Sequence, residues 1–200
     1  GTVYILRNQQ PYLNNRGEVF GTYYSITYQA GNDLHKGIKN VLAKVNASLS
    51  PFNKSSIITA INNNEEIVPD SMFIKVFSLA QSISAKTDGA FDITVAPLVN
   101  AWGFGFKKGV PVDSTRIDSL RSLVGYEGVS LIDGKVVKQK PGTMLDCSAI
   151  AKGYGCDMVA LMFDRLLITG GVCLEDFPRP ISALRAWMRH LVRHGDRPEG

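Results

Sequence analysis

The chain of 200 residues is 44% hydrophobic and 20% charged, which is typical of a single globular domain. Its net charge of +4 is mild, and no dense run of Lys and Arg interleaves with aromatic residues, so the composition does not support nucleic-acid binding. No stretch of about 18 consecutive apolar residues occurs, so no helix is predicted to cross a bilayer.

Residues 1–17 are predicted to be a polar tether. Residues 1–7 lack the charged region and the cleavage site of a signal peptide, and residues 8–17 are polar without periodicity. We expect that an export signal or membrane anchor preceded this tether and was removed, with Val3–Leu6 as its remnant.

A strand and a helix are predicted next. Residues 19–29 are rich in Tyr, Thr and Ile, which is typical of a strand. Asp33 is predicted to begin a helix that Ser50-Pro51 ends, because apolar residues recur every 3.6 positions. These residues are Leu34, Ile38, Leu42, Val45 and Leu49. Residues 57–61 are interpreted as a short strand or a turn.

Two further helices, a hairpin and a last helix are predicted after these. Pro69-Asp70 is predicted to begin a second helix, and residues 111–113 a third. Their apolar faces would carry Phe73, Val76, Phe77, Ala80 and Ile83 in the second helix and Ile117, Leu120 and Leu123 in the third. Asp133-Gly134 between two apolar runs predicts a hairpin with a type I′ turn. With a last helix over 149–166, the pattern predicts an α+β fold with a mixed sheet.

The segment Thr87–Gly105 is rich in glycine and ends in Trp-Gly-Phe-Gly. Glycines let the backbone approach a ligand closely, and aromatic rings offer flat surfaces to a planar ligand. The alternative is a tight turn that leads into a core strand.

The segment Pro141–Gly155 has a turn, a short apolar run, an Asp and small residues that begin a helix. Asp146 or Ser148 is predicted to cap this helix. A helix N-terminus with small residues favours a phosphate, and Lys152 would add a full charge. The alternative is an ordinary capped helix with a solvated lysine. The three cysteines form no metal-binding spacing and are interpreted as free and structural.

These two segments together resemble the ApbE family of flavin transferases. The resemblance rests on Thr-Asp-Gly-Ala-Phe-Asp-Ile-Thr-Val-x-Pro-Leu-Val-x-x-Trp-Gly-Phe-Gly, followed by Asp-x-x-Ala-Ile-Ala-Lys-Gly-Tyr. It also includes residues 20–24, 49–56 and 124–126, and covers residues 18–166. It implies an Mg²⁺-dependent FAD:protein FMN transferase, in which a threonine of a target protein attacks the FMN phosphorus of FAD and AMP leaves.

The resemblance also implies which residues form the site. The implied FAD contacts are Phe20, Phe52, Ala90, Phe91, Asp92, Asp146, Ser148 and Lys152. Ala149 matches the position whose main-chain carbonyl binds the metal. No catalytic residue is assigned, because the remaining metal ligands and a suspected histidine base match nothing here. The 200 residues alone are therefore expected to be inactive or nearly so. Phe52 stands where the family often has tyrosine, and Ser148 where many members have glycine.

The composition changes near residue 166. All twelve lysines lie at or before Lys152, whereas six of the ten arginines lie at or after Arg165. We expect that residues 167–200 come from a shifted reading frame. The alternative is a native basic tail, in which apolar and arginine residues of 181–193 form an amphipathic helix.

Two other functions stay open on the sequence. The same phosphate-binding residues would serve an FAD pyrophosphatase that forms FMN and AMP, or a non-catalytic flavin-binding remnant. For a transferase, the resemblance implies an acceptor with a Ser/Thr-Gly-Ala-Thr-type motif in electron-transport or sodium-pump subunits. It also implies a place on the periplasmic side of the bacterial inner membrane, with a lipid or helical anchor outside these residues.

Overall fold

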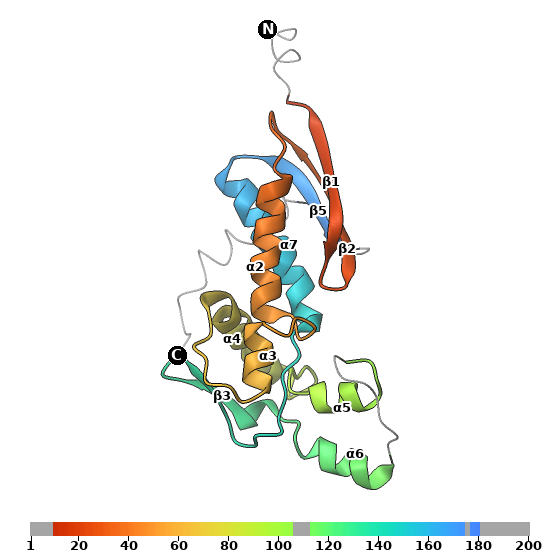
Figure 1. Ribbon diagram of the computed structural model, residues 1–200, viewed down its shortest axis with the longest axis vertical. Helices are drawn as coiled ribbons and strands as arrows, with labels where there is room; N and C mark the ends of the chain where they lie inside the picture. The colour runs from red at the N-terminus through yellow and green to blue at the C-terminus, as the bar shows by residue number, and fades with distance from the viewer. Residues whose placement is uncertain (1–9, 106–112, 175–176, 181–200) are drawn as a thin grey trace. The chain divides into compact units, whose positions relative to one another are not determined.

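The computed structural model describes residues 10–105, 113–174 and 177–180, with side chains up to residue 168. The chain divides into two compact units (Figure 1). Unit 1 comprises residues 1–43 and 152–200, and unit 2 comprises residues 44–151. None of the helices in the described part of the chain is both long and apolar enough to cross a membrane.

Unit 1 contains a four-stranded antiparallel sheet. Its strands are β1 (Tyr12–Val19), β2 (Thr22–Gln29), β5 (Thr169–Leu174) and β6 (Phe177–Pro180), in the order β1-β2-β5-β6. Phe20 and Gly21 join β1 to β2 with φ angles of 55° and 73°, which is the geometry of a two-residue primed hairpin turn. The predicted strand over 19–29 is thus the second arm of a hairpin.

Strand β1 corrects the prediction of a polar tether, since residues 12–17 belong to the sheet. Its polar side chains pair across the hairpin, where the Asn14 amide donates to the hydroxyls of Ser25 and Thr27 at 3.2 and 2.8 Å. The sequence of β1 shows no hydrophobic pattern, because the strand exposes every second side chain and buries none fully. An edge strand of this kind depends on backbone pairing and polar cross-strand pairs.

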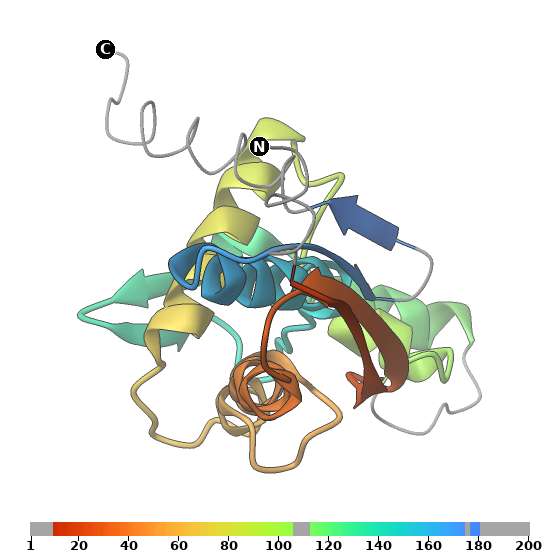
Figure 2. The ribbon, with the colours of Figure 1, turned by 90° about the horizontal axis from the view of Figure 1, so that it is seen from above.

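Helices α2 (His35–Leu49) and α7 (Ser148–Arg165) cover one face of this sheet (Figures 1 and 2). The contacting residues from β2, α2 and α7 are Tyr24, Ile26, Tyr28, Ile38, Leu42, Cys156, Val159, Ala160 and Phe163, all buried. The stripe predicted for the first helix is confirmed, since its last four members are buried and Leu34 packs partly against this core.

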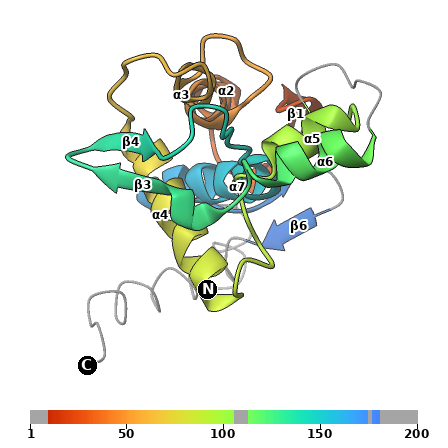
Figure 3. The same ribbon diagram turned by 90° about the horizontal axis from the view of Figure 1, so that it is seen from below.

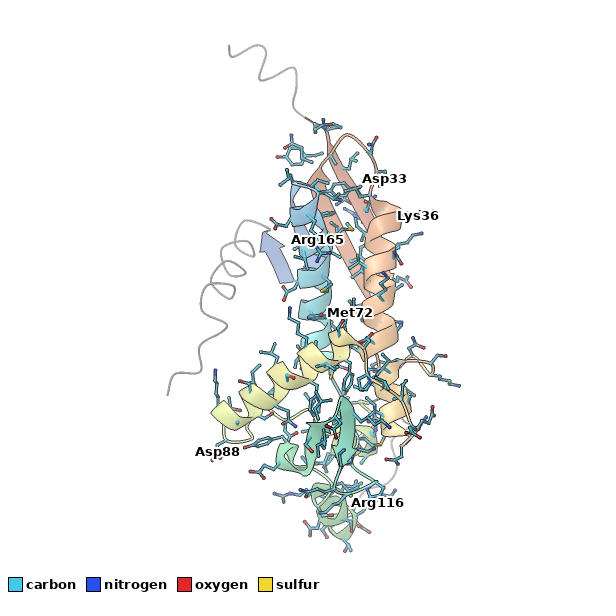
Figure 4. All side chains as sticks on the ribbon, turned by 90° about the vertical axis from the view of Figure 1, so that its left-hand side faces the viewer. Asp33, Lys36, Met72, Asp88, Arg116 and Arg165 are labelled. Carbon is cyan, nitrogen blue, oxygen red and sulfur yellow. The ribbon has the colours of Figure 1, made fainter. Side chains whose placement is uncertain are left out.

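Tyr28 links β2 to the start of α2. Its hydroxyl accepts a hydrogen bond from Leu34 N at 2.7 Å and lies 2.7 and 3.0 Å from the acceptors Asn15 Oδ1 and Asp33 Oδ1. Asp33, at the top of α2 in Figure 4, also accepts from His35 N at 2.9 Å and so caps the helix as predicted. Hydrogen bonds from His35 N, Asn15 and Tyr28 lower the pKa of Asp33.

Strand β5 also corrects the boundary predicted near residue 166. It pairs with β2 from Thr169 opposite Gln29 to Leu174 opposite Tyr24. The regular fold therefore continues beyond the point at which the composition changes. Residues 181–200, where the basic helix was the alternative, lie outside the described residues.

Unit 2 is built mainly of helices (Figure 3). They are α3 (Ile57–Asn62), α4 (Ser71–Lys86), α5 (Ala96–Ala101) and α6 (Ser114–Arg121). A hairpin of β3 (Val129–Ile132) and β4 (Lys135–Lys138) follows the short 3-10 turn Tyr126–Gly128. Asp133 and Gly134 have φ angles of 49° and 74°, which confirms the predicted type I′ turn.

Most predicted helix starts in unit 2 are confirmed by their caps. Asp70 accepts from Phe73 N and Asp113 from Arg116 N, both at 2.8 Å. Residues 57–61 form helix α3, which corrects the strand or turn prediction, because the Ser56 hydroxyl accepts from Thr59 N and starts a helix despite its β-branched residues. Residues 96–101 are helical, although the alternative for this segment was a tight turn that leads into a core strand.

The described strands pair antiparallel throughout, and one isolated parallel bridge joins Val95 to Met144. Helices and small sheets alternate along the chain, so the predicted α+β class is confirmed.

Replacing Tyr28 with Phe should lower the free energy of unfolding by about 1–3 kcal/mol, because Leu34 N loses its acceptor in a half-buried position. Urea denaturation followed by circular dichroism measures the change. Tyr23→Phe is the matched control, since Tyr23 is 70% exposed on the same strand. Equal unfolding midpoints for the two variants would show that the Tyr28 hydroxyl does not stabilise unit 1.

Candidate functional site

The two unusual sequence segments meet in unit 2. Asp146 N donates to the carbonyl oxygen of Ile93 at 2.8 Å, and Val95 and Met144 form a parallel bridge. Residues 93–95 and 144–146 therefore run side by side. This pairing places Ala90, Phe91 and Asp92 before one strand-like segment and Ser148 after the other, so the structure brings most of the predicted site residues into one region.

The Asp92 carboxylate holds a turn of its own unit. Its Oδ1 atom accepts from the backbone N and the hydroxyl of Thr94, both at 2.7 Å, and its Oδ2 atom accepts from Tyr126 N at 2.9 Å. The Thr94 hydroxyl oxygen accepts in turn from Gly125 N at 2.8 Å. Asp92 is thus already hydrogen-bonded by the protein, and the predicted contact with FAD would have to use its remaining acceptor capacity.

Residues 87–91 form a tight turn at the end of α4. Asp88 (visible at the end of the helix in Figure 4) and Gly89 have φ angles of 51° and 75°, and Gly89 N returns to the carbonyl of Ser84 at 2.9 Å. The Thr87 hydroxyl accepts from Phe91 N at 3.2 Å. The turn leaves Ala90 exposed and Phe91 half-buried.

The start of α7 has fewer free backbone N–H groups for a phosphate than the sequence predicts. Asp146 Oδ1 accepts from Ser148 N at 2.7 Å, so Asp146 is the cap, while Ser148 is the first helical residue. The N–H groups of Ile150 and Ala151 both donate to the carbonyl of Cys147. Three of the first four helical N–H groups therefore have acceptors already, and that of Ala149 remains as a donor among the described residues.

Ala149 is exposed in the first turn of α7. In a regular helix its carbonyl accepts from the amide four residues later, which leaves one lone pair for a metal. No group of three or more His, Cys, Asp or Glu side chains in the described residues can hold a metal ion. Mg²⁺ takes six oxygens in octahedral geometry, so the residues described do not by themselves form its site.

The remaining predicted residues are distributed over both units. Phe52 follows α2 in unit 2 and is 59% exposed. Lys152 lies one turn after Ser148 on α7, at the first position that belongs to unit 1. Phe20 lies in the β1–β2 turn of unit 1, where it packs against the core. The FAD contacts of these residues stay predictions.

Cys147, between Asp146 and Ser148, is fully buried. Burial, with a smaller contribution from the Asp146 charge, raises the pKa of its thiol to about 12. The thiol therefore stays protonated at neutral pH and packs as a small apolar group, in agreement with the structural role expected from the sequence.

Sequence reasoning missed Asn62, the last residue of α3. Its buried side chain accepts from Leu145 N at 2.7 Å and donates to the carbonyl of Leu145 at 2.8 Å. It also assigned no role to Thr94 or Gly125. Gly125 has a φ of 150°, a conformation that favours glycine. The resemblance at residues 124–126 signalled this turn, whereas no sequence pattern signalled Asn62.

Two shallow grooves in unit 2 lie outside these segments. One of about 500 Å³ lies between α4 and β3, and one of about 400 Å³ lies between residues 61–67 and β4. Neither of these two grooves is lined by a residue of the predicted site.

The model of the ApbE family matches residues 20–173. Two curated relatives, both named FAD:protein FMN transferase, come from Haemophilus influenzae and Vibrio cholerae. The first is 32% identical over 75% of this chain and 48% of its own length, and the second is 33% identical over 72% and 46%. The chain spans about half the length of the curated relatives it matches.

Solved structures agree with the family match. The flavin transferase ApbE from Vibrio cholerae superposes with a TM-score of 0.80 at 28% identity, over 85% of this chain and 59% of that one. The apo form of the flavinyl transferase ApbE from Pseudomonas stutzeri superposes with a TM-score of 0.78 at 26% identity, over 86% and 61%.

Asp92→Asn should lower the free energy of unfolding by about 1–3 kcal/mol, because the new amide NH₂ group cannot accept a hydrogen bond and Tyr126 N or Thr94 N loses its acceptor. The measurement is the urea midpoint. Asp88→Asn is the control, since Asp88 is exposed and asparagine tolerates its positive φ. If Asp92→Asn unfolds at the same urea concentration as Asp88→Asn, the carboxylate does not stabilise the turn.

Cys147 should resist iodoacetamide in the folded chain at pH 8, because its thiol is buried and protonated. Peptide mass spectrometry after brief labelling measures modification of Cys147, and labelling in urea provides the fully accessible reference. Rapid modification of Cys147 without denaturant would contradict its burial.

Proposed function

The chain belongs to the ApbE family, and we propose that its protein is a FAD:protein FMN transferase. The proposal rests on one observation above all: the bond between Asp146 N and the Ile93 carbonyl joins the two segments whose residues match the family. The relatives with that name match most of this chain, which supports the same activity. The structure describes about half of such a protein, so its full activity and its partners are part of the proposal.

In the proposed reaction, the hydroxyl oxygen of an acceptor threonine forms a bond to the FMN phosphorus of FAD. The bond from that phosphorus to the bridging oxygen breaks, and AMP leaves. Phosphoryl transfer depends chiefly on positioning and on stabilising charge. Within this chain, Ala90 and Phe91 would contact the cofactor, Asp146 would accept a hydrogen bond from it, and Ala149 N and Lys152 would donate to its phosphates.

Mg²⁺ is part of the proposal as the cation that neutralises the pyrophosphate. The Ala149 carbonyl is the ligand proposed within this chain. Because the other predicted ligands match no residue of the 200, we propose that these residues alone transfer little or no FMN.

We propose an acceptor protein with a Ser/Thr-Gly-Ala-Thr-type motif, such as an electron-transport or sodium-pump subunit. The proposed location is the periplasmic side of the bacterial inner membrane, with the anchor outside these residues. Fractionation of cells that express the complete gene tests the location, and recovery of the protein in the cytosol would contradict it.

Asp146→Asn should weaken FAD binding about tenfold, since it removes a charged acceptor while its amide oxygen still caps Ser148. Titration of flavin fluorescence with the purified complete gene product measures the affinity. Asp133→Asn is the matched control, because Asp133 is exposed in the β3–β4 turn and Asn-Gly suits that turn equally well. Equal FAD affinities for the two variants would show that the Asp146 carboxylate does not contact FAD.

Product analysis distinguishes the alternatives when the complete gene product is incubated with FAD, Mg²⁺ and an acceptor peptide. Threonine-linked FMN with released AMP supports the transferase, and free FMN with AMP supports a pyrophosphatase. Unchanged FAD would refute both activities.

A further inference from the structure

Asn62 binds the backbone of Leu145 at two points. The amide oxygen of Asn62 accepts from Leu145 N at 2.7 Å, and its Nδ2 atom donates to Leu145 O at 2.8 Å. Asn62 is 6% exposed and Leu145 is fully buried, so water does not compete for these bonds. Because an amide side chain presents one donor and one acceptor, it pairs with a peptide group as a neighbouring strand would.

This two-point contact lies one residue before the proposed flavin contact Asp146. Met144, which precedes Leu145, forms the bridge to Val95. Asp146, which follows Leu145, donates its N–H group to Ile93 O. Leu145 therefore has Asn62 as the partner of both its backbone groups, while its neighbours are bonded to residues 93–95. The position of Asp146 relative to residues 90–92 depends on both sets of bonds.

Two further side chains attach the end of α3 to residues 141–143, which directly precede this segment. The Lys138 ammonium donates to the carbonyls of Ile61 and Thr143 at 2.9 and 3.1 Å, and the Asn64 amide donates to Pro141 O at 3.2 Å. Burial lowers the pKa of Lys138. These contacts hold residues 141–143, which precede the paired segment. Asn62 instead binds Leu145, the residue next to Asp146.

We propose that Asn62 is a positioning residue for the flavin site, which sets FAD affinity by holding Leu145 and thereby the backbone of Asp146. Asn62 itself does not contact FAD in this proposal. The inference rests on the proposed function for its flavin part, and its structural part stands on the hydrogen bonds alone.

Asn62→Asp tests the proposal, because the carboxylate can still accept from Leu145 N but cannot donate to Leu145 O. Amide hydrogen exchange by NMR should show at least about tenfold faster exchange at Leu145 and Asp146, and FAD affinity should fall about tenfold. Asn63→Asp is the matched chemical control, since Asn63 is exposed and donates only to Glu65 at 3.0 Å among the described residues.

Ile58→Val controls for general destabilisation of α3. Ile58 is fully buried on the same helix, and its side chain has no group that could hydrogen-bond to Leu145. It should lower the melting temperature with FAD affinity nearly unchanged. If Ile58→Val weakens FAD binding as much as Asn62→Asp at equal loss of melting temperature, Asn62 has only a structural role and the proposal fails.

A double-mutant cycle with Asp146→Asn decides whether Asn62 acts through Asp146. If it does, Asn62→Asp should weaken FAD binding much less in the Asp146→Asn background than in the parent. Full additivity would overturn the proposal, and so would unchanged exchange at Leu145 and Asp146. Absence of FAD binding by the complete gene product would instead refute the proposed function and the flavin part of the inference, while the exchange rates decide the structural part.

Discussion

The side-by-side pairing of residues 93–95 with residues 144–146 is the constraint on which the candidate site depends. It is maintained by backbone groups, chiefly Asp146 N to Ile93 O and the bridge between Val95 and Met144. Backbone pairing is indifferent to side-chain identity, so the residues around it can be chosen for a ligand. The segments are about fifty positions apart in sequence, and closing such a loop is entropically unfavourable. Side-chain bonds from Asn62 and Asp92 help to offset that cost.

Carboxylates that the sequence assigns to a ligand also stabilise the protein. Asp92 binds the Tyr126 backbone and Thr94, and Asp146 caps α7 through Ser148. Both roles are compatible with ligand binding, because a carboxylate has acceptor capacity beyond the bonds it makes here. Loss of flavin binding on replacing either residue would therefore combine two effects, a lost contact and a displaced backbone. Separating these effects requires variants that keep one of the two bonds.

Polar hydrogen-bond hubs recur at the points where the elements of each unit join. In unit 1 the Tyr28 hydroxyl connects β1, β2 and the start of α2, and in unit 2 the Lys138 ammonium connects α3 to residue 143. The Tyr28 hydroxyl gives Leu34 N an acceptor at the start of α2, and the Lys138 ammonium joins two backbone carbonyls from distant segments. The helices α3, α5 and α6 are too short to be stable alone, so they depend on such junctions and on apolar burial.

The sequence by itself determined the helices with a clear apolar stripe, the Asp133-Gly134 hairpin, the α+β class and the family, because periodicity and turn chemistry act over a few neighbouring residues. It misread β1 and α3, whose polar edge and β-branched residues carry no such pattern. Only the tertiary structure decided the partners of Asn62, Asp92 and Thr94, which lie 83, 34 and 31 positions away. A polar side chain shows in the sequence what it can donate or accept, but its partner depends on how distant segments pack together.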